Sequence, residues 1–308
     1  MKSLVILCVA TTLALGGSAA HALRLPTAPR CPVFPASNPW NQRVDSLPVA
    51  GNSATMIQSI GLDAPLHPDF GSGLYDGQPI GIPFDVVTRK TPRSRVAFEY
   101  ADESDKGPYP IPNTVHIERG RASTGDRHAL LVDRDACRLY ELYALYPKPG
   151  GWKAGSGAIW RLRSNALRPA GWTSADAAGL PIFAGLARWD EVRRGTIDHA
   201  LRFTARETRR AFVYPARHYA SDSNDPSLPP MGLRVRLKAS VEVGGFPPQA
   251  RVVLTALKRY GMILADNGAP WFVSGAPDPH WSNDQLHTLA RLHGSDFEVV
   301  DTSSLPHP

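Results

Sequence analysis

Short apolar stretches, separated by glycine and proline, run through most of the chain. Their alternation and bounds predict strands at 80–87, 95–100, 157–163, 197–204, 211–215 and 233–243. The clearest pair is 128–132 and 138–146, whose connection Asp133-Arg134-Asp135 predicts a hairpin. The second of these two strands has apolar residues on both faces, so we expect it to be covered on both sides.

Helical spacing is found once early in the chain and then in the last third. A short helix is predicted over 52–60, with Ser53 as a candidate cap, and a longer one over 249–260. Ser282 has the capping-box spacing of a third helix over 282–293. Short strands are predicted at 262–265 and 297–300. The expected class is mainly β (α+β), an antiparallel β-sandwich or jelly-roll-like fold with a few packed helices in the C-terminal third.

The N-terminus has the pattern of a cleavable signal peptide over residues 1–22. Lys2 precedes an apolar run over 4–15, and Ala20-His21-Ala22 is a small-x-small cleavage site. The apolar run is shorter than the roughly 20 residues that cross a bilayer. We therefore expect a secreted or periplasmic protein with an extended Pro-rich segment at 23–50 and a single β-rich domain at 51–308.

The composition is rich in proline and glycine, and the chain has a mild positive charge. The 308 residues include 29 Pro and 26 Gly without periodicity, which is typical of many short strands rather than collagen or disorder. The formal net charge is +6, carried mostly by Arg spread along the chain. A dedicated nucleic-acid or membrane surface normally shows clustered charge, so neither partner is expected, and we expect a monomer.

Three cysteines occur, and Cys8 belongs to the predicted signal peptide. Cys31 and Cys137 remain as an even pair in an oxidising compartment, which predicts a disulfide between them. Two isolated thiols are poor metal ligands without partners at a suitable spacing.

Glu141 is the strongest candidate for a proton donor. It shares a strand face with Leu139, Tyr143 and Leu145, and burial there would raise its pKa. A raised pKa is what a general acid needs near neutral pH. The alternative is a structural ion pair with one of the many arginines.

The polar, glycine-flanked loop at 171–181 supplies the candidate partner. Asp176 is expected at the start of a helical turn, where its charge would be stabilised, and Trp172 is a candidate platform for a sugar ring. The alternative is an ordered structural corner. No G-x-S-x-G elbow is present, so an α/β-hydrolase serine is not indicated.

Basic side chains beside histidines form a further group of candidates. His with Arg suits acid/base work beside a carboxylate-bearing substrate. No H-x-H, H-E-x-x-H or C-x-x-C pattern joins them, so no metal site is expected. His128 is a catalytic candidate, as is His218, and the candidate substrate-binding residues are His199, Arg202 and Arg217.

Asp266-Asn267-Gly268 follows a predicted buried strand and has strong turn chemistry. Asp266 is the reserve catalytic carboxylate, and Asn267 is a candidate substrate ligand. Trp271 is either a stacking platform or a core residue.

The stretch at 99–105 contains four carboxylates in seven residues. Such oxygen-rich clusters bind calcium in some extracellular proteins, but this one fits no EF-hand loop. A solvated acidic loop is the favoured interpretation, and no cofactor is expected.

Several runs together resemble those of a family of secreted bacterial proteins: YADESD at 100–105, GDRH at 125–128, RPAGWTSADAAGLP at 168–181, HALRFT at 199–204 and ADNG at 265–268. The resemblance spans roughly residues 31–302. It implies secretion and a single folded unit, and it supplies neither an activity nor a catalytic residue.

The residues favour a secreted enzyme acting on an extracellular polysaccharide, with a glycoside hydrolase using paired carboxylates as the first hypothesis. Glu141 and Asp176 are the first pair, with Asp266 in reserve. A polysaccharide lyase using His and Arg is the second hypothesis. The third is a non-catalytic carbohydrate-binding or envelope-associated protein.

Overall fold

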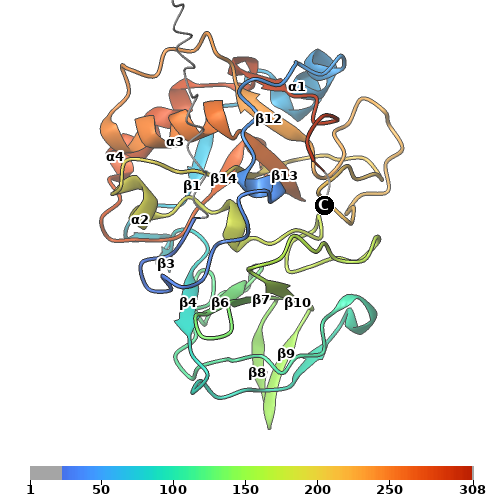
Figure 1. Cartoon of the computed structure of the whole chain (residues 1–308), viewed down its shortest axis with the longest axis vertical. Coiled ribbons are helices and arrows are strands. Elements are labelled where there is room, and N and C mark those ends of the chain that lie inside the picture. The colour runs from blue at the N-terminus through green and yellow to red at the C-terminus, as the bar shows by residue number, and fades with distance from the viewer. Residues whose placement is uncertain (1–22, 307–308) are drawn as a thin grey trace, which may run out of the picture.

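The computed structural model describes residues 23–306, so the predicted signal peptide lies outside the described residues (Figure 1). The upper half in Figure 1 contains a six-stranded sheet in the order β1-β14-β11-β13-β12-β15. Its strands are β1 (His67–Asp69), β11 (Leu201–Ala205), β12 (Arg234–Leu237), β13 (Met262–Asn267), β14 (Phe272–Ser274) and β15 (Phe297–Val299).

The lower half contains a four-stranded sheet in the order β10-β7-β6-β4. Its strands are β4 (Phe84–Val87), β6 (Ala129–Asp133), β7 (Arg138–Tyr143) and β10 (Ser156–Arg161). A smaller three-stranded sheet contains β5 (Val96–Phe98), β8 (Tyr146–Lys148) and β9 (Gly151–Ala154), and a two-stranded hairpin contains β2 (Leu74–Tyr75) and β3 (Gln78–Pro79).

The helices pack mainly around the six-stranded sheet. They are α1 (Ser53–Gly61), α2 (Trp189–Val192), α3 (Pro248–Arg259) and α4 (Asn283–His287). Short 3-10 turns are η1 (Pro39–Asn41), η2 (Ala101–Glu103), η3 (Phe183–Gly185), η4 (Thr288–Arg291) and η5 (Gly294–Asp296). The predicted class, mainly β with a few helices in the C-terminal third, is confirmed. Both large sheets also contain parallel pairs, β1 with β14, β11 with β13, and β4 with β6.

The predicted hairpin is present as the antiparallel pair β6 and β7, and both faces of β7 are buried. Leu139 packs into the large hydrophobic core that β7 shares with the six-stranded sheet. Tyr140 and Leu142 point to the other face, into a smaller core against which Phe98 and Trp152 of the three-stranded sheet pack. The four-stranded sheet therefore lies between two apolar layers.

Local signals predicted most helix ends correctly. Gly261 follows α3 with a φ of +65°, a conformation that favours glycine. The Ser282 side chain accepts a hydrogen bond from the Gln285 N–H, as a capping residue does. The predicted helix 282–293 is shorter than expected, because α4 gives way to the 3-10 turn η4.

One predicted strand, 211–215, is wrong. Only Phe212 pairs there, in a single parallel bridge with Met231. Pro215 follows three residues later and has no backbone N–H to donate, so a ladder cannot continue through it. The predicted strand 197–204 begins only at Leu201, which leaves His199 before the strand rather than within it.

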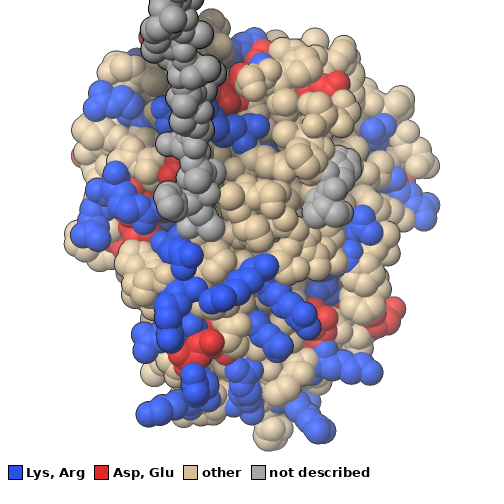
Figure 2. Space-filling model, in the orientation of Figure 1, with Lys and Arg blue, Asp and Glu red and all other residues tan. Residues whose placement is uncertain are grey.

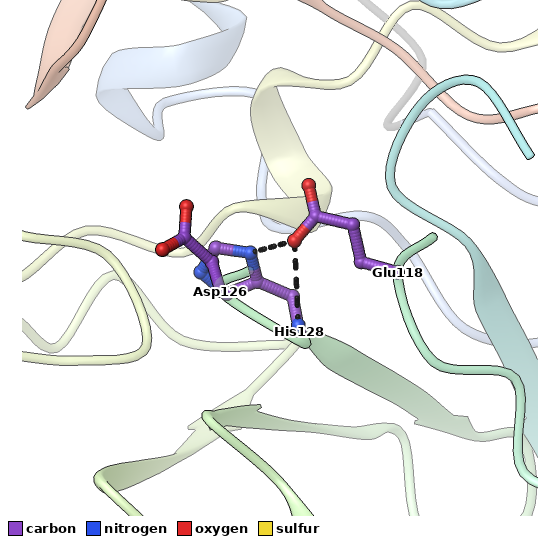
Figure 3. A group of neighbouring side chains, drawn as sticks. All are labelled: Glu118, Asp126 and His128. Atoms are coloured by element: carbon purple, nitrogen blue, oxygen red, sulfur yellow. Dashed lines mark hydrogen bonds and ion pairs between the residues drawn. The ribbon is translucent and has the colours of Figure 1, made fainter. Parts of the chain in front are cut away.

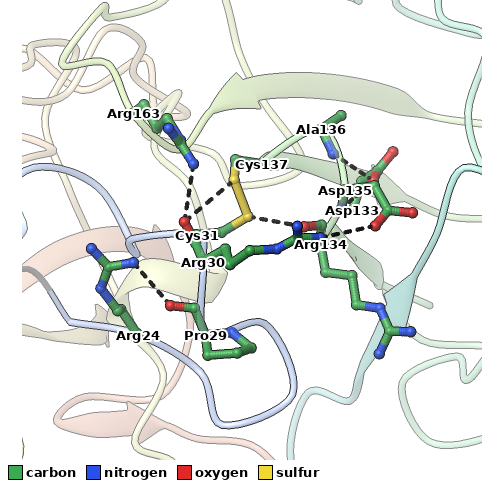
Figure 4. Close-up of a disulfide and its surroundings, with 10 residues drawn as sticks. All are labelled: Arg24, Pro29, Arg30, Cys31, Asp133, Arg134, Asp135, Ala136, Cys137 and Arg163. Carbon is green, nitrogen blue, oxygen red and sulfur yellow. Dashed lines mark hydrogen bonds and ion pairs between the residues drawn. A yellow bond between two sulfur atoms is a disulfide. The ribbon is translucent and has the colours of Figure 1, made fainter.

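The predicted disulfide is confirmed between Cys31 and Cys137, whose Cα atoms are 5.2 Å apart (Figure 4). It joins the segment 23–50 to the turn that connects β6 and β7. Trp40 and Val44 are buried, so this Pro-rich segment is packed into the core rather than laid over the surface.

Arginines that are far apart in the sequence gather near this disulfide. Arg30 and Arg134 lie beside it, and the Arg163 guanidinium donates to the Arg30 carbonyl oxygen (Figure 4). Arg138 and Arg161 are exposed and directly paired across β7 and β10. On the side of the molecule drawn in Figure 2, Lys and Arg gather over the lower half. No helix within 23–306 is both long and apolar enough to cross a membrane.

Candidate functional site

A cavity of about 450 Å³ lies where the two large sheets meet. The four-stranded sheet contributes its near edge, since His128 directly precedes β6 and Tyr143 ends β7. The six-stranded sheet contributes Asp266 and Asn267 at the end of β13. The other lining residues are Tyr100, Glu103, Asp126, Thr173, Ser174, Ala175, Asp176, Ala177, His218 and Ala220.

A smaller cavity of about 150 Å³ continues from it. The two cavities share Asp126, His128, Asp266 and Asn267 as lining residues, and the smaller one is also lined by Arg202. Asp266 and His128 therefore lie at the junction of the two spaces.

Arg202 holds two carboxylates of this site together. Its Nε and Nη2 donate to the two oxygens of Asp176, at 3.0 and 2.8 Å, and Nη2 also donates to Asp266 at 3.0 Å. Its Nη1 donates to the Ser274 hydroxyl at 2.8 Å. Burial would lower the pKa of Arg202, but the carboxylates of Asp176 and Asp266 outweigh burial and raise it. Arg202 is therefore a fixed cation.

Asp266 is the carboxyl group best placed to transfer a proton to a ligand in the cavity. One cation serves both Asp176 and Asp266, and Arg202 binds Asp176 with two hydrogen bonds. Burial and the charge of Asp176 raise the pKa of Asp266 to about 7, against the opposing charge of Arg202. Its side chain is 25% exposed, so the group that holds this proton can be reached from the cavity.

His128 is held in its charged form by two acceptors. Nδ1 lies 2.6 Å from Glu118 Oε2 (Figure 3), and Nε2 lies 3.0 Å from the Ala175 carbonyl oxygen. A carbonyl oxygen only accepts, so Nε2 carries a proton, and Nδ1 donates to the carboxylate. Burial would lower the pKa of His128, but Glu118 outweighs it and raises that pKa to about 9.

Glu118, Asp126 and His128 are the one group among residues 23–306 with ligand atoms close enough for a metal ion, all within 4.8 Å of one another. The imidazole does not fit that role, because both of its nitrogens carry protons and neither has a free lone pair. Burial would raise the pKa of Glu118, and the charge and hydrogen bonds of His128 outweigh it and lower that pKa. The cluster is an ion pair beside the exposed carboxyl group of Asp126.

Glu141, the first sequence candidate, is fully buried and lines neither cavity. Its oxygens accept hydrogen bonds from the backbone N–H groups of Ile182 and Phe183, at 3.0 and 2.8 Å. Burial raises its pKa to about 7, against these two hydrogen bonds, so the raised pKa expected from the sequence is present. The carboxyl group joins β7 to the start of η3, and we give it no role in the chemistry.

Six sequence candidates line the cavities: Arg202 and Asp266, described above, and Asp176, His128, His218 and Asn267. Asp176 lines the larger cavity, but both of its oxygens are occupied by Arg202. His218 lines it with Nδ1 2.8 Å from the Ala177 carbonyl oxygen. Asn267 lines both cavities, and its side-chain oxygen accepts from the Thr208 hydroxyl. His128 is present as the charged group described above.

Four candidates for substrate binding lie elsewhere. His199 is fully buried with Nε2 3.2 Å from Glu191. Arg217 donates to the Arg168 carbonyl oxygen, and the Arg168 guanidinium lies over the Trp172 ring. For Trp271 the core alternative holds, because its ring is fully buried and stacked between those of Phe203 and Phe297. None of the four lines either cavity.

In the acidic stretch at 99–105, Glu99 and Asp102 are exposed to solvent, whereas Glu103 and Asp105 are tied to the protein. Glu103 Oε2 accepts from the Thr173 N–H at 2.9 Å, and Asp105 pairs with Arg168 at 2.7 Å. Glu103 lines the larger cavity together with Tyr100. Sequence reasoning did not single out Glu118, Asp126, Tyr100 or Tyr143, because each belongs to a different loop or strand end and no spacing relates them.

No protein-family model, curated protein or solved structure matches this chain significantly. The function is therefore argued from the site's own chemistry.

Proposed function

We propose that the protein is a secreted glycoside hydrolase that cleaves an extracellular polysaccharide, with Asp266 as the proton donor. The observation that carries the proposal is the carboxyl group of Asp266, which keeps its proton up to about pH 7 and opens into a cavity of about 450 Å³. Hydrolysis of a glycosidic bond needs such a carboxylic acid to protonate the leaving oxygen. Sequence reasoning had placed Asp266 only in reserve.

The second carboxyl group is assigned to Asp126. It is exposed, and it lines both cavities together with Asp266. Hydrolysis needs a carboxylate opposite the acid, either to activate water or to attack the sugar. Asp176 is less suited to this task because its side chain is fully buried and Arg202 occupies both of its oxygens.

The charges around the larger cavity favour hydrolysis over elimination. Elimination from a uronate needs a cation that neutralises the sugar's carboxylate. The lining residues include Glu103, Asp126, Asp176 and Asp266, with no Lys or Arg among those that the structure describes there. The charged ring of His128 is already paired with Glu118. A neutral sugar fits these surroundings better than an anionic one.

Purified protein incubated with a panel of neutral and anionic polysaccharides tests the proposal. We expect new reducing ends from a neutral polysaccharide and no absorbance from unsaturated uronates. Asp266→Asn should lower the rate at least about 100-fold, the lower range for loss of a general acid or base, and Asp126→Asn should also lower it strongly. Asp63→Asn, a change at an exposed position outside the cavities, serves as the matched control.

Two results would overturn the proposal. Unsaturated uronates without hydrolysis would make the protein a lyase. Binding of a polysaccharide without any product, under conditions where the protein is folded, would make it a binding protein.

A further inference from the structure

A third cavity, of about 320 Å³, adjoins the central cavity of the site. It shares Asp69, Glu118 and Phe272 with the central cavity of about 150 Å³, which in turn shares Asp126 and Asp266 with the largest one. We call the three adjoining spaces the cleft. Both end cavities have the size of a site for a small ligand, roughly 300–1,000 Å³.

Two exposed tyrosines lie at the ends of the cleft. Tyr75 is 72% exposed and lines the third cavity, and Tyr100 is 47% exposed and lines the first. Among residues 23–306, no other Tyr, Phe or Trp is classed as exposed. The exposed aromatic side chains of the described chain are thus confined to the cleft, with Asp266 near the boundary of the first and central cavities.

Tyr75 is presented by a hairpin of defined geometry. β2 pairs with β3, so that Tyr75 is opposite Gln78. The connecting residues Asp76 and Gly77 both have positive φ, at 50° and 71°, which is the conformation of a two-residue type I′ turn. The tyrosine ring therefore projects from a paired strand rather than from a free loop.

The third cavity combines aromatic and polar groups. The Phe272 ring stacks on His67, with ring centres 4.0 Å apart. Asn283 and His287 add polar groups to the lining. Aromatic faces with a few hydrogen-bonding side chains suit a sugar, whose ring has an apolar face and polar edges.

We propose that a polysaccharide chain lies along the whole cleft, with sugar rings stacked on Tyr75 and Tyr100, so that cleavage at Asp266 falls within the chain rather than at its end. This inference rests on the proposed function for its cleavage step, while the binding step stands on the cleft alone. The substrate class is then a long polysaccharide that is neutral where it meets the acidic lining of the first cavity.

Binding is tested with soluble β-glucan, xylan, mannan and amylose and with their di- to hexasaccharides, by calorimetry on the Asp266→Asn protein. Adding Tyr75→Ala should weaken binding of a hexasaccharide about tenfold and leave a disaccharide that fills only the first cavity nearly unaffected. Tyr75→Phe should retain binding. Leu74→Ala is the matched control, because Leu74 is 65% exposed on the same hairpin and does not line the cavity.

Cleavage is tested on the wild-type background, with product lengths followed over time. Tyr75→Ala should raise KM for the polymer with little change in kcat, since stacking far from the reacting bond stabilises ground and transition states alike. Early products should be of mixed length. Equal behaviour of Tyr75→Ala and Leu74→Ala, or release of one short product from the chain end, overturns the inference.

The two proposals fail in different ways. One possible result is that Tyr75 contributes to binding of long oligosaccharides but no glycan is hydrolysed. That result overturns the proposed function and the internal cleavage, and it supports the cleft as a polymer-binding site. Hydrolysis without a Tyr75 effect supports the proposed function and overturns the cleft. No binding by any of the four glycans or their oligosaccharides overturns both.

Discussion

Arg202 joins two carboxyl groups that have different freedom to act: its Nη2 lies 2.8 Å from Asp176 Oδ1 and 3.0 Å from Asp266 Oδ2. Asp176 receives a second hydrogen bond from Nε and is fully buried, whereas Asp266 is partly exposed to the cavity. Because a single cation serves both groups, the less tightly bound one retains a proton more readily. This division gives one group a structural role and leaves the other available for proton transfer.

Removing that cation should destabilise the whole protein. Arg202→Met would leave the fully buried carboxyl group of Asp176 and the partly buried one of Asp266 without their shared partner, and we expect a loss of about 3–5 kcal/mol in the free energy of unfolding, measured with urea. Arg194→Met is the matched control, because its pair with Asp190 is 38% and 20% exposed and should contribute less than about 1 kcal/mol. A loss no larger than that of the control would contradict the central place of Arg202.

The pH dependence of activity should follow Asp266. As pH rises through about 7, Asp266 loses the proton that the proposed reaction requires, so kcat/KM should fall on the alkaline side. Asp176→Asn should move this fall to lower pH, because it removes the neighbouring charge and leaves Arg202 free to pair with Asp266. An unchanged alkaline limb in Asp176→Asn would show that another group sets it.

The stability of the protein, like its activity, should fall as pH rises. The raised pKa values of Asp266 and Glu141, about 7, and of His128, about 9, mean that the folded state binds more protons than the unfolded chain. Their contribution is complete below the unfolded pKa values, roughly 4 for the carboxyl groups and 6.5 for histidine. The free energy of unfolding should therefore fall as pH rises, first through about 7 and then through about 9.

Urea unfolding at pH 5, 7 and 9 measures this trend. His128→Gln should make the free energy of unfolding less dependent on pH between pH 6.5 and 9, whatever its effect on absolute stability. Glu118 contributes to stability in the opposite sense, since its pKa is lowered and its contribution is lost as pH falls. A protein that becomes more stable from pH 5 to pH 9 would contradict the protonation states assigned to the cleft.

Loss of the disulfide should act mainly through the unfolded chain. Cys31 and Cys137 are 106 residues apart in the sequence, and opening a loop of that length costs roughly 4–5 kcal/mol in the chain-entropy model. The double change Cys31→Ala/Cys137→Ala should lower the urea midpoint accordingly. The fully reduced wild-type protein should have the same urea midpoint as the variant. If the midpoint of the variant equals that of the oxidised wild-type protein, the prediction is refuted.

Local chemistry made the fold class and many elements predictable. Gly261 ends α3, the Ser282 side chain caps α4, and the turn after Asp133 connects β6 to β7, each through contacts within a few residues. The raised pKa of Glu141 was also predictable, since a strand that is apolar on both faces leaves a carboxyl group without water.

The candidate site was predicted less well because its contacts are long-range. Glu141 was expected to donate a proton into a cavity, but the backbone of Ile182 and Phe183 occupies its oxygens. That contact joins residues about 40 positions apart, which no local pattern encodes. Asp126 carries no distinguishing spacing, and its proposed role depends on β13, which brings Asp266 to the same cavities.

The junction of the two sheets also determines when the cleft exists during folding. Glu103, Asp126, Asp176, Arg202 and Asp266 come from five separate stretches of the chain, and each must be in place before the cavity has walls. Contacts between distant residues form late, because the intervening loops must close first. A partly folded chain thus has no cleft, which confines the proposed hydrolytic activity to the completed fold.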